Sequence, residues 1–316
     1  MENKVRFSII IPMFNVEKNI ERCIEPLLEM KINNFEIILV DDGSYDATRQ
    51  ICEKIAKSNN RCRYFYQKNQ GVSQARNYGM CMAHGDYFIF VDADDFCLSE
   101  QLEEVLKRIQ IPENGWCVFD YYYIEDGEKN YIQRPKNIEK YEGAIKCVYG
   151  GKTNCVWACI YEAKIIKKNK IEFDTELKIG EDWIFNIKYV SCCQNIQYYS
   201  FAFYNYVNNS NSVMNTIDFN KIYEYLKLYQ MYSCLEEKED FLQEGYYSIM
   251  RSLLGIILKF DFESRKKVYL CLKKDRTFSD MKKISIVGVK RKIIKYCLIH
   301  GLYRNKVLSN LIQLRL

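Results

Sequence analysis

The chain has 316 residues, of which 48% are hydrophobic, and its formal net charge at pH 7 is +5. This length and apolar content predict a folded protein with room for one large domain and a smaller one, which excludes a disordered chain. The charge is uneven: residues 280–316 hold nine Lys or Arg against one Asp, a net of +8, which leaves −3 for residues 1–279.

Cysteine and histidine usage limits the chemistry further. The fourteen cysteines are scattered through apolar runs without a C-x-x-C pair, so most are expected to be reduced core thiols. His84 and His300 are the only histidines, so a histidine-built zinc site is nearly excluded and any metal needs oxygen ligands. The first apolar run ends at Pro12 and is too short for a signal-peptide core or a membrane span. We therefore expect a cytoplasmic protein.

Strands and helices alternate at the beginning of the chain. Short apolar runs predict strands over residues 7–11, 35–40, 62–66 and 87–91. Apolar residues at helical spacing predict helices over residues 20–28, 47–55 and 72–82. Pro26 lies inside the first helical pattern, so a kink or an early end is expected there. This alternation predicts an α/β fold with a doubly wound, mostly parallel sheet.

The pattern changes after a helix predicted over residues 99–110. Shorter β-rich segments over 116–123 and 154–161 predict a mixed β region in which the parallel order breaks down. A helix then opens at residues 179–183, and an aromatic strand covers 196–206. From about Asp218 the apolar spacing predicts a helical region that continues to the end of the chain.

Polar residues follow three of the predicted strands. They are residues 12–15, 41–44 and 92–95. Because ligands of such sheets bind at the carboxyl ends of the strands, these three clusters are expected to meet in one crevice. The cluster with Asp92, Asp94 and Asp95 has the ligand type that Mg²⁺ or Mn²⁺ prefers. A solvated turn would explain the same residues, since Asp is common in turns.

Other motifs also have a structural and a functional interpretation. Asp41 could contact a base or ribose, while Gly43 and Ser44 could simply form a turn that caps the following helix. Gly71 starts a helix that carries Arg76, which either faces a nucleotide or pairs with a carboxylate of the crevice. Glu181 and Asp182 begin a helix, where acids are favourable in any case. Tyr121, Tyr122, Tyr123 and Trp157 could form core or a platform for stacking on a sugar.

Taken together, these motifs resemble those of the family 2 glycosyltransferases, whose fold is called GT-A. The resemblance rests on the order and spacing of Ser8-Ile-Ile-Ile-Pro12-Met-Phe14-Asn15, Asp41-Asp42-Gly43-Ser44, Asn69-Gln-Gly71-Val-Ser-Gln-Ala-Arg76-Asn77, Asp92-Ala-Asp94-Asp95 and Gly180-Glu181-Asp182. It spans residues 5 to about 210, and it is strongest for the bacterial capsule, exopolysaccharide and lipopolysaccharide branch.

The resemblance implies roles for the first motifs in binding a nucleotide sugar. Asp41 would hydrogen-bond the base, with the loop of Pro12, Phe14 and Asn15 beside it. Gly71 and Arg76 would complete the nucleotide site.

The acidic motifs would carry the chemistry. Asp92 would contact the ribose or the metal shell, and Asp94, with help from Asp95, would hold Mg²⁺ or Mn²⁺ against the diphosphate; either aspartate could be the nearer ligand. Asp182 matches the general base of the family, which would take a proton from the acceptor hydroxyl. The metal would stabilise departure of the nucleotide diphosphate. A single attack implies an inverting transfer without a covalent sugar–enzyme intermediate.

The implied enzyme is a hexosyl- or N-acetylhexosaminyl-transferase. A UDP-sugar is the expected donor, and a glycan or a polyprenyl-linked oligosaccharide is the expected acceptor. Residues 1–212 would form the catalytic domain, with a nucleotide-sugar half over about 1–112 and an acceptor half over about 113–212, and residues 213–316 would form a helical region. The alternatives are a non-catalytic nucleotide-sugar-binding or scaffold subunit, and a sugar nucleotidyltransferase. A nicotinamide dehydrogenase is disfavoured because G-x-G-x-x-G is absent after the first strand.

Basic and apolar residues alternate over residues 282–306. This pattern suits a helix lying on an anionic membrane surface, as a peripheral contact. A helix that packs on the rest of the protein with a solvated basic face would give the same pattern. Nucleic-acid binding is the weakest interpretation, and we expect no nucleic-acid partner.

Overall fold

The computed structural model describes residues 6–135, 138, 141–208, 218–235, 239–283 and 289–305. The described residues fall into two compact units. The first, here called the sheet unit, lies within residues 1–148, 153–176 and 181–209, and the second, the helical unit, within 149–152, 177–180 and 210–316. The assignment of nucleotide and acceptor roles to the two halves of residues 1–212 stays a prediction.

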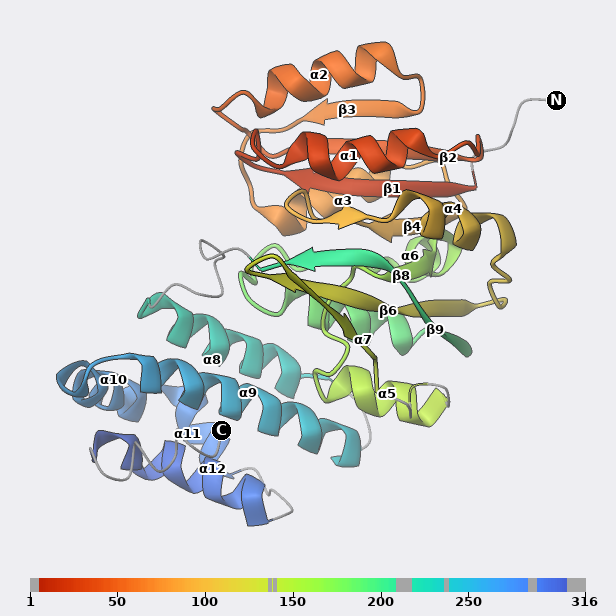
Figure 1. The fold of residues 1–316 in the computed structure, drawn as a ribbon. Helices are drawn as coiled ribbons and strands as arrows, with labels where there is room; N and C mark the ends of the chain where they lie inside the picture. Colours follow the sequence, from red (N-terminus) through yellow and green to blue (C-terminus); the bar gives the residue numbers. More distant parts are fainter. Residues whose placement is uncertain are drawn as a thin grey trace. The chain divides into compact units, whose positions relative to one another are not determined.

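The sheet unit is built on one mixed sheet of nine strands among the described residues. The strands are β1 (Phe7–Met13), β2 (Phe35–Asp41), β3 (Cys62–Tyr66), β4 (Tyr87–Phe90), β5 (Phe96–Cys97), β6 (Gly115–Glu125), β7 (Glu128–Ile132), β8 (Cys159–Glu162) and β9 (Asn195–Val207). Their order is β3-β2-β1-β4-β8-β6-β9-β5, with β7 paired to β6 (Figure 1).

Two strands of the main run, β8 and β5, are antiparallel to their neighbours. β3, β2, β1 and β4 are parallel, β8 is antiparallel to both β4 and β6, and β6 is parallel to β9. The predicted α/β fold with a mostly parallel sheet and a mixed β region is therefore confirmed. Because β8 is the only reversal between β4 and β6, the carboxyl ends of β1, β2, β4, β6 and β9 lie at the same edge.

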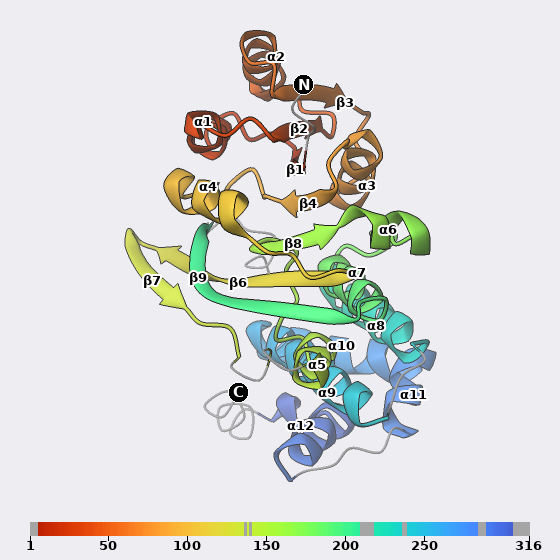
Figure 2. The same cartoon turned by 90° about the vertical axis from the view of Figure 1, so that its right-hand side faces the viewer.

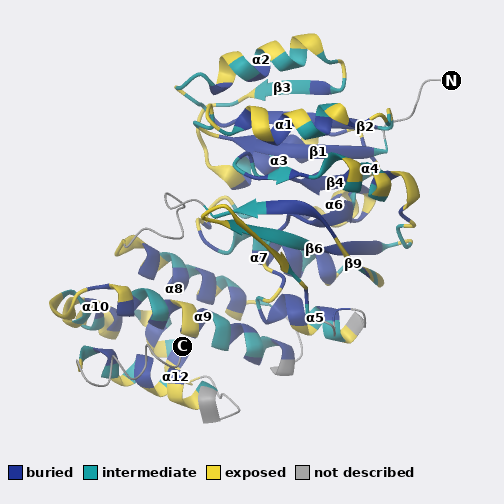
Figure 3. Cartoon of the chain, viewed as in Figure 1, coloured by how far each residue is buried: buried dark blue, intermediate teal, exposed yellow. Residues whose placement is uncertain are grey.

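Helices cover both faces of the parallel strands. They are α1 (Ile20–Glu29), α2 (Thr48–Ser58), α3 (Val72–Met82), α4 (Ser99–Arg108), α6 (Ala163–Asn169) and α7 (Glu181–Val190), and α5 (Tyr141–Tyr149) precedes β8. Alternate side chains of β1 point to opposite faces, so Ile9 and Ile11 join the core beneath α1, α2 and α4. Ile10 faces α3 instead, and Figure 2 shows α1 and α3 on opposite sides of the strands. β1 and β2 are therefore buried along their whole length, whereas β3 is mostly half-buried (Figure 3).

Two details of these helices bear on the predictions. α1 continues through Pro26 to Glu29, so the expected early end is wrong. Pro26 lacks a backbone N–H, so α1 loses one hydrogen bond there. Burial of one face of the helix, formed by Ile20, Cys23, Ile24 and Leu27, stabilises α1 by more than this loss costs. In α3, Gly79 allows a close approach to β1, because a Cβ there would lie 2.4 Å from Ile10 Cγ2.

The helical unit has its own core. Its elements are α8 (Asn220–Ser233), α9 (Glu239–Lys259), α10 (Phe262–Lys274), α11 (Arg276–Lys283), α12 (Val289–His300) and the short 3₁₀ helix η3 (Leu302–Arg304). Buried side chains such as Tyr229, Leu253 and Leu298 fill this core. The predicted helical region is thus present over the described part of residues 218–305. No helix of that part, or of the described sheet unit, is long and apolar enough to cross a bilayer.

All fourteen cysteines are free thiols. Nine of them, including Cys23, Cys117 and Cys159, are buried, and burial raises the pKa of each of these three thiols. Cys81, Cys234 and Cys271 are exposed.

Candidate active site

The first loop of the site follows β1 and is joined to the loop after β2. Asn15 has a φ of 52°, and its N–H donates to Ser44 Oγ at 3.0 Å. In return, the N–H of Tyr45 donates to Asn15 Oδ1 at 3.0 Å. The Phe14 ring lies 5.9 Å from the Tyr45 ring, edge to face, and both rings are exposed, at 44% and 85%. Two exposed aromatic rings at a strand end offer apolar surface to a planar ligand.

Asp41 is buried and holds the turn after β2. Its Oδ1 accepts from the Ser44 N–H at 2.8 Å, and its Oδ2 accepts from the Tyr64 hydroxyl at 2.7 Å. Burial, with a further contribution from Asp41, raises the pKa of Tyr64, so the phenol keeps its proton for this bond. The structure places Asp41 at the edge of the sheet where β1 and β2 end, while its contact with a nucleotide base stays a prediction.

Asp42, to which we gave no role from the sequence, fixes the third loop. Its Oδ1 accepts from the Gln67 side chain at 2.7 Å and from the Gln70 N–H at 2.8 Å. Its Oδ2 accepts from the Gly71 N–H at 2.8 Å. Gly71 caps α3 with a φ of 93°, which only glycine adopts readily. The carboxylate of Asp42, which follows β2, thereby fixes the position at which α3, the helix that carries Arg76, begins.

The aspartates that follow β4 occupy different environments. Asp95 is 1% exposed, with Oδ2 accepting from the Tyr204 hydroxyl at 2.6 Å and Oδ1 from the Val207 N–H at 2.7 Å. The Tyr204 hydroxyl also accepts from the Asp92 N–H at 3.2 Å. Burial raises the pKa of Asp95 well above its usual range, and the nearby Asp92 adds to this. Asp95 therefore ties the end of β9 to the loop after β4.

Asp92 and Asp94 are more open than Asp95. Both residues are half-buried, and the carbonyl of Asp94 accepts from Arg22 Nη2 at 2.6 Å. Among the described residues no group of three or more His, Cys, Asp or Glu is arranged to hold a metal by itself. A Mg²⁺ or Mn²⁺ ion needs only one or two carboxylates when substrate phosphates and water complete its shell. The donor set of Asp92 and Asp94 fits that requirement, whereas both oxygens of Asp95 already accept hydrogen bonds.

Arg76 joins the two acidic motifs. Its Nη2 donates to Asp92 Oδ1 at 2.9 Å, and its Nη1 lies 2.7 Å from Asp182 Oδ1 and 3.3 Å from Glu181 Oε1. The arginine side chain is 4% exposed and lies over the Phe173 ring, 5.2 Å from its centre. Of the two interpretations of Arg76, the pairing with carboxylates of the crevice is the one that the structure shows. It brings together carboxylates that are ninety residues apart in the sequence.

Asp182 lies at the start of α7 in this network. Burial raises the pKa of Asp182 well above its usual range, and the charge of Arg76 opposes that shift. The nearby backbone N–H of Val156 also opposes that shift in the pKa of Asp182. A carboxylate with a raised pKa is a better proton acceptor near neutral pH than an ordinary aspartate. Asp182 can therefore accept a proton in this crevice.

Of the four aromatic residues that could form core or a sugar platform, Trp157 is buried, whereas Tyr121, Tyr122 and Tyr123 are half-buried. Trp157 is 8% exposed and stacks on Tyr204, with ring centres 4.9 Å apart and planes 3° apart. The Tyr121 ring meets Trp157 edge to face at 4.7 Å. For Trp157 the core interpretation is therefore correct. The sequence contained no local signal for the contact between Tyr204 and Asp95, which are 109 residues apart.

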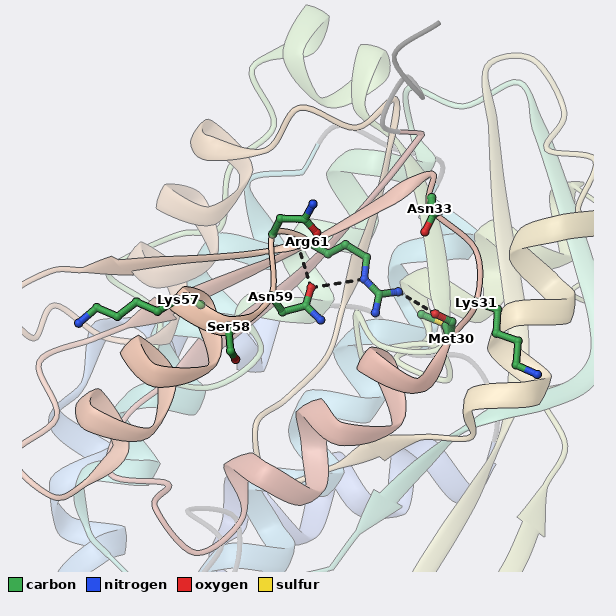
Figure 4. A pocket seen from close by; sticks show the side chains of 9 residues that line it. Met30, Lys31, Asn33, Lys57, Ser58, Asn59 and Arg61 are labelled. Atoms are coloured by element: carbon green, nitrogen blue, oxygen red, sulfur yellow. Dashed lines mark hydrogen bonds between the residues drawn. The ribbon is translucent and has the colours of Figure 1, made fainter.

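A separate pocket of about 710 Å³ lies where α1 and α2 end, at the opposite edge of the sheet (Figure 4). Arg61 fills part of its wall and donates to the carbonyls of Leu28 at 2.6 Å and Met30 at 2.7 Å. Its guanidinium also reaches Asn59 Oδ1 at 3.4 Å. The lining contains none of the predicted site residues and no carboxylate, so this pocket is separate from the candidate active site.

Comparisons with known proteins agree with this arrangement. The sequence model of glycosyl transferase family 2 matches residues 8–169. The chain is 30% identical over 213 residues to EpsJ of Bacillus subtilis (strain 168), named an uncharacterized glycosyltransferase. That match covers 65% of this chain and 62% of EpsJ, so the chain spans less than two thirds of its relative.

Solved structures share the fold at low sequence identity. TarS of S. aureus in complex with UDP-GlcNAc superposes with a TM-score of 0.70 at 22% identity, covering 95% of this chain and 89% of that one. The mannosyltransferase PcManGT of Pyrobaculum calidifontis, in complex with GDP-Man and Mn²⁺, gives 0.57 at 12% identity, covering 96% and 88%.

Proposed function

Because the chain belongs to glycosyl transferase family 2, we propose that it transfers a sugar from a UDP-sugar to a hydroxyl of a glycan or lipid-linked acceptor, with inversion. The Arg76 network is the observation that supports this proposal most strongly, because it assembles Asp92 and Asp182 around one buried cation. The UDP-GlcNAc complex of TarS supports a UDP-sugar as the donor. The similarity to EpsJ, which is named an uncharacterized glycosyltransferase, supports the transferase activity.

The chain's own residues account for the two halves of the reaction. The exposed rings of Phe14 and Tyr45 offer a surface for the base, and the loop held by Asp42 directs the start of α3 toward the donor. Asp182 takes the proton of the acceptor hydroxyl as that oxygen attacks the anomeric carbon, and the bond to the diphosphate breaks at the same time. One displacement inverts the anomeric centre.

Asp94 and Asp92 would hold the divalent cation, because they are the less enclosed carboxylates of the loop. When bound, Mg²⁺ or Mn²⁺ would offset the charge that develops on the leaving diphosphate. Asp95 fixes this loop to β9 by accepting hydrogen bonds from the Tyr204 hydroxyl and the Val207 N–H. The Mn²⁺ in the complex of PcManGT supports this part of the proposal.

We also propose that α12 contacts an anionic membrane surface. The helix buries Ile294, Cys297 and Leu298 in the helical unit, while Ile293 and Tyr296 are 52% and 56% exposed. Its exposed side therefore combines these apolar residues with Lys292, whereas Arg291 pairs with Glu244. Residues 284–288 and 306 of the predicted membrane segment lie outside the described residues. A cytoplasmic location and the absence of a nucleic-acid partner stay predictions.

A donor screen tests the proposed function. The purified protein is incubated with UDP-, GDP- and dTDP-sugars and Mn²⁺, and the released nucleotide is measured by mass spectrometry. We expect release from a UDP-sugar that is lost in Asp94→Asn and Asp182→Asn. Asp86→Asn is the matched control, since Asp86 is exposed and precedes the opposite end of β4. Binding of a nucleotide sugar without turnover would contradict the proposal and favour a scaffold subunit.

A further inference from the structure

Arg134 is a buried cation without a carboxylate partner. Its exposed fraction is 4%, and no described carboxylate forms an ion pair with its guanidinium. Nε donates to the Phe119 carbonyl at 3.2 Å and Nη2 to Cys155 Sγ at 3.1 Å, while Nη1 has no hydrogen bond to a described residue. The rings of Tyr121 and Trp157 lie 5.2 and 5.6 Å from the guanidinium carbon. An arginine stays charged in proteins, so this site holds a full, unneutralised positive charge.

Asp120, which accepts from the backbone of Arg134, is already satisfied by neutral donors. Asp120 is fully buried and accepts from the hydroxyls of Tyr131 at 2.5 Å and Tyr198 at 2.9 Å. The backbone N–H of Arg134, not its side chain, donates to Asp120 Oδ1 at 2.7 Å. Burial, with a contribution from Asp120, raises the pKa of Tyr131 to about 12, so this phenol remains a donor. Arg134 and Asp120 are thus not a structural ion pair.

The Arg134 side chain lies beside the proposed catalytic groups on the acceptor side. The segment that contacts its guanidinium, Cys155 to Trp157, includes Val156, whose backbone N–H lowers the pKa of Asp182 and so lies near that carboxyl. Trp157 stacks on Tyr204, which in turn contacts Asp95. Ala158, the next residue, is held at a φ of 52°, a strained conformation for a residue other than glycine. Arg134 is therefore connected to Asp95 through the stacked rings of Trp157 and Tyr204.

Arg134 contacts a strand that lies away from the loops proposed to bind the donor. The Phe119 carbonyl and Tyr121 belong to β6, which lies three strands from β1 in the order β1-β4-β8-β6. At about 4.8 Å per strand, this places β6 roughly 14 Å from β1 along the sheet. Figure 2 shows β6 with its partner β7 away from the strands that carry the loops of Asn15 and Asp41.

We propose that Arg134 binds an anionic group of the acceptor. The acceptor then carries either a phosphate or a carboxylate next to the hydroxyl that attacks the donor sugar. Arginine binds both groups through its planar fork, and a partly desolvated cation that is oriented by two aromatic rings binds them more strongly than a solvated one. This inference rests on the proposed transferase function, because it assigns the charge of that reaction's acceptor.

Two assays test the subsite, and the first does not depend on turnover. Calorimetry measures the binding of inorganic phosphate with UDP and Mg²⁺ present at saturation, so that the donor site is filled. We expect phosphate to bind the unmutated protein and to bind Arg134→Met about tenfold to a hundredfold more weakly. Arg134→Lys, which keeps the charge but not the fork, should lose part of the affinity. Arg61→Met is the matched control, because Arg61 is another arginine that donates to backbone carbonyls.

The second assay compares acceptors. Alkyl hexosides, their 6-phosphates and the corresponding uronic acids are offered with the UDP-sugar found in the donor screen. We expect a lower KM for one of the two anionic classes, and the class identifies the oxyanion; Arg134→Met should remove that preference while hydrolysis of the donor persists. Equal use of neutral and anionic acceptors, or phosphate binding that Arg134→Met and Arg134→Lys leave unchanged, overturns the proposal.

The two proposals fail in different ways. If neither variant folds, the unmutated protein decides: absence of phosphate binding together with no preference for anionic acceptors refutes the subsite. If the unmutated protein releases no nucleotide from any donor, the transferase proposal is refuted while the calorimetric result still decides whether Arg134 binds an anion.

Discussion

Replacing Arg76 with methionine removes the cation that holds three carboxylates together. Asp92, Glu181 and Asp182 would remain in place with side-chain exposures of 27%, 16% and 16%. Removing one partner of a buried ion pair costs about 3–5 kcal/mol, because the remaining charge is left without compensation. The partial exposure of Asp92 favours the lower end of this range, so we expect the free energy of unfolding to fall by about 3 kcal/mol at neutral pH.

The loss should depend on pH in a defined direction. Without Arg76, burial and mutual repulsion raise the pKa of Asp182 further in the folded state, so the folded protein binds more protons than the unfolded chain. Stability then rises as pH falls from neutral toward that raised pKa. The deficit of Arg76→Met is therefore expected to shrink in acid, and Arg76→Met/Asp182→Asn should recover part of it at neutral pH.

Both effects are measured by urea unfolding, followed by circular dichroism, at several pH values from about 5.5 to about 8. A carboxyl group with a raised pKa titrates in or near this range. Arg49→Met is the control, because Arg49 forms an exposed pair with Glu53 and no change in the midpoint is expected. An Arg76→Met protein as stable as the unmutated one at neutral pH would refute the reasoning. So would a deficit that neither acid nor the second substitution reduces.

Three further results are expected. Tyr204→Phe leaves Asp95 without its hydroxyl donor and should lower the free energy of unfolding by about 1–3 kcal/mol in urea titrations, with a higher Mn²⁺ requirement for turnover; an unchanged midpoint would contradict the contact. Gly71→Ala forces a residue with a Cβ to a φ of 93° and should weaken UDP binding in calorimetry, whereas Gly127→Ala, at a φ of 82° in the turn between β6 and β7, should not. The pH profile of kcat/KM should fall in acid through a pKa above the usual aspartate range, because burial raises the pKa of Asp182; a profile that is flat down to pH of about 4 would exclude this base.

The parallel half of the fold could be predicted because its signals are local. Each buried strand, such as β2, is a continuous apolar run, and each helix, such as α4, shows its buried face as a repeat in Leu102 and Leu106. Since parallel strands end at one edge, the meeting of the loops at Asn15, Asp42 and Asp92 followed from the topology. Pro26 was misjudged because tertiary burial of α1 outweighed a local penalty.

The contacts that decide the roles of the acidic residues are not local. Asp92, Asp94 and Asp95 look equivalent in sequence, and only the return of β9 beside β5 places Tyr204 and Val207 on Asp95. β5 has two residues, too few to give a periodic signal. The sequence likewise did not predict that Arg134 has no carboxylate partner among the described residues. This depends on Asp120 accepting its hydrogen bonds from Tyr131 of β7 and Tyr198 of β9.

The stereochemical course of transfer tests the central claim most directly. Proton NMR of the reaction with an α-linked UDP-sugar, recorded before the product equilibrates, reports the anomeric configuration of the first product. A single displacement assisted by Asp182 predicts a β-configured product from the unmutated protein and none from Asp182→Asn. An α-configured product, or unchanged turnover in Asp182→Asn, would contradict the account.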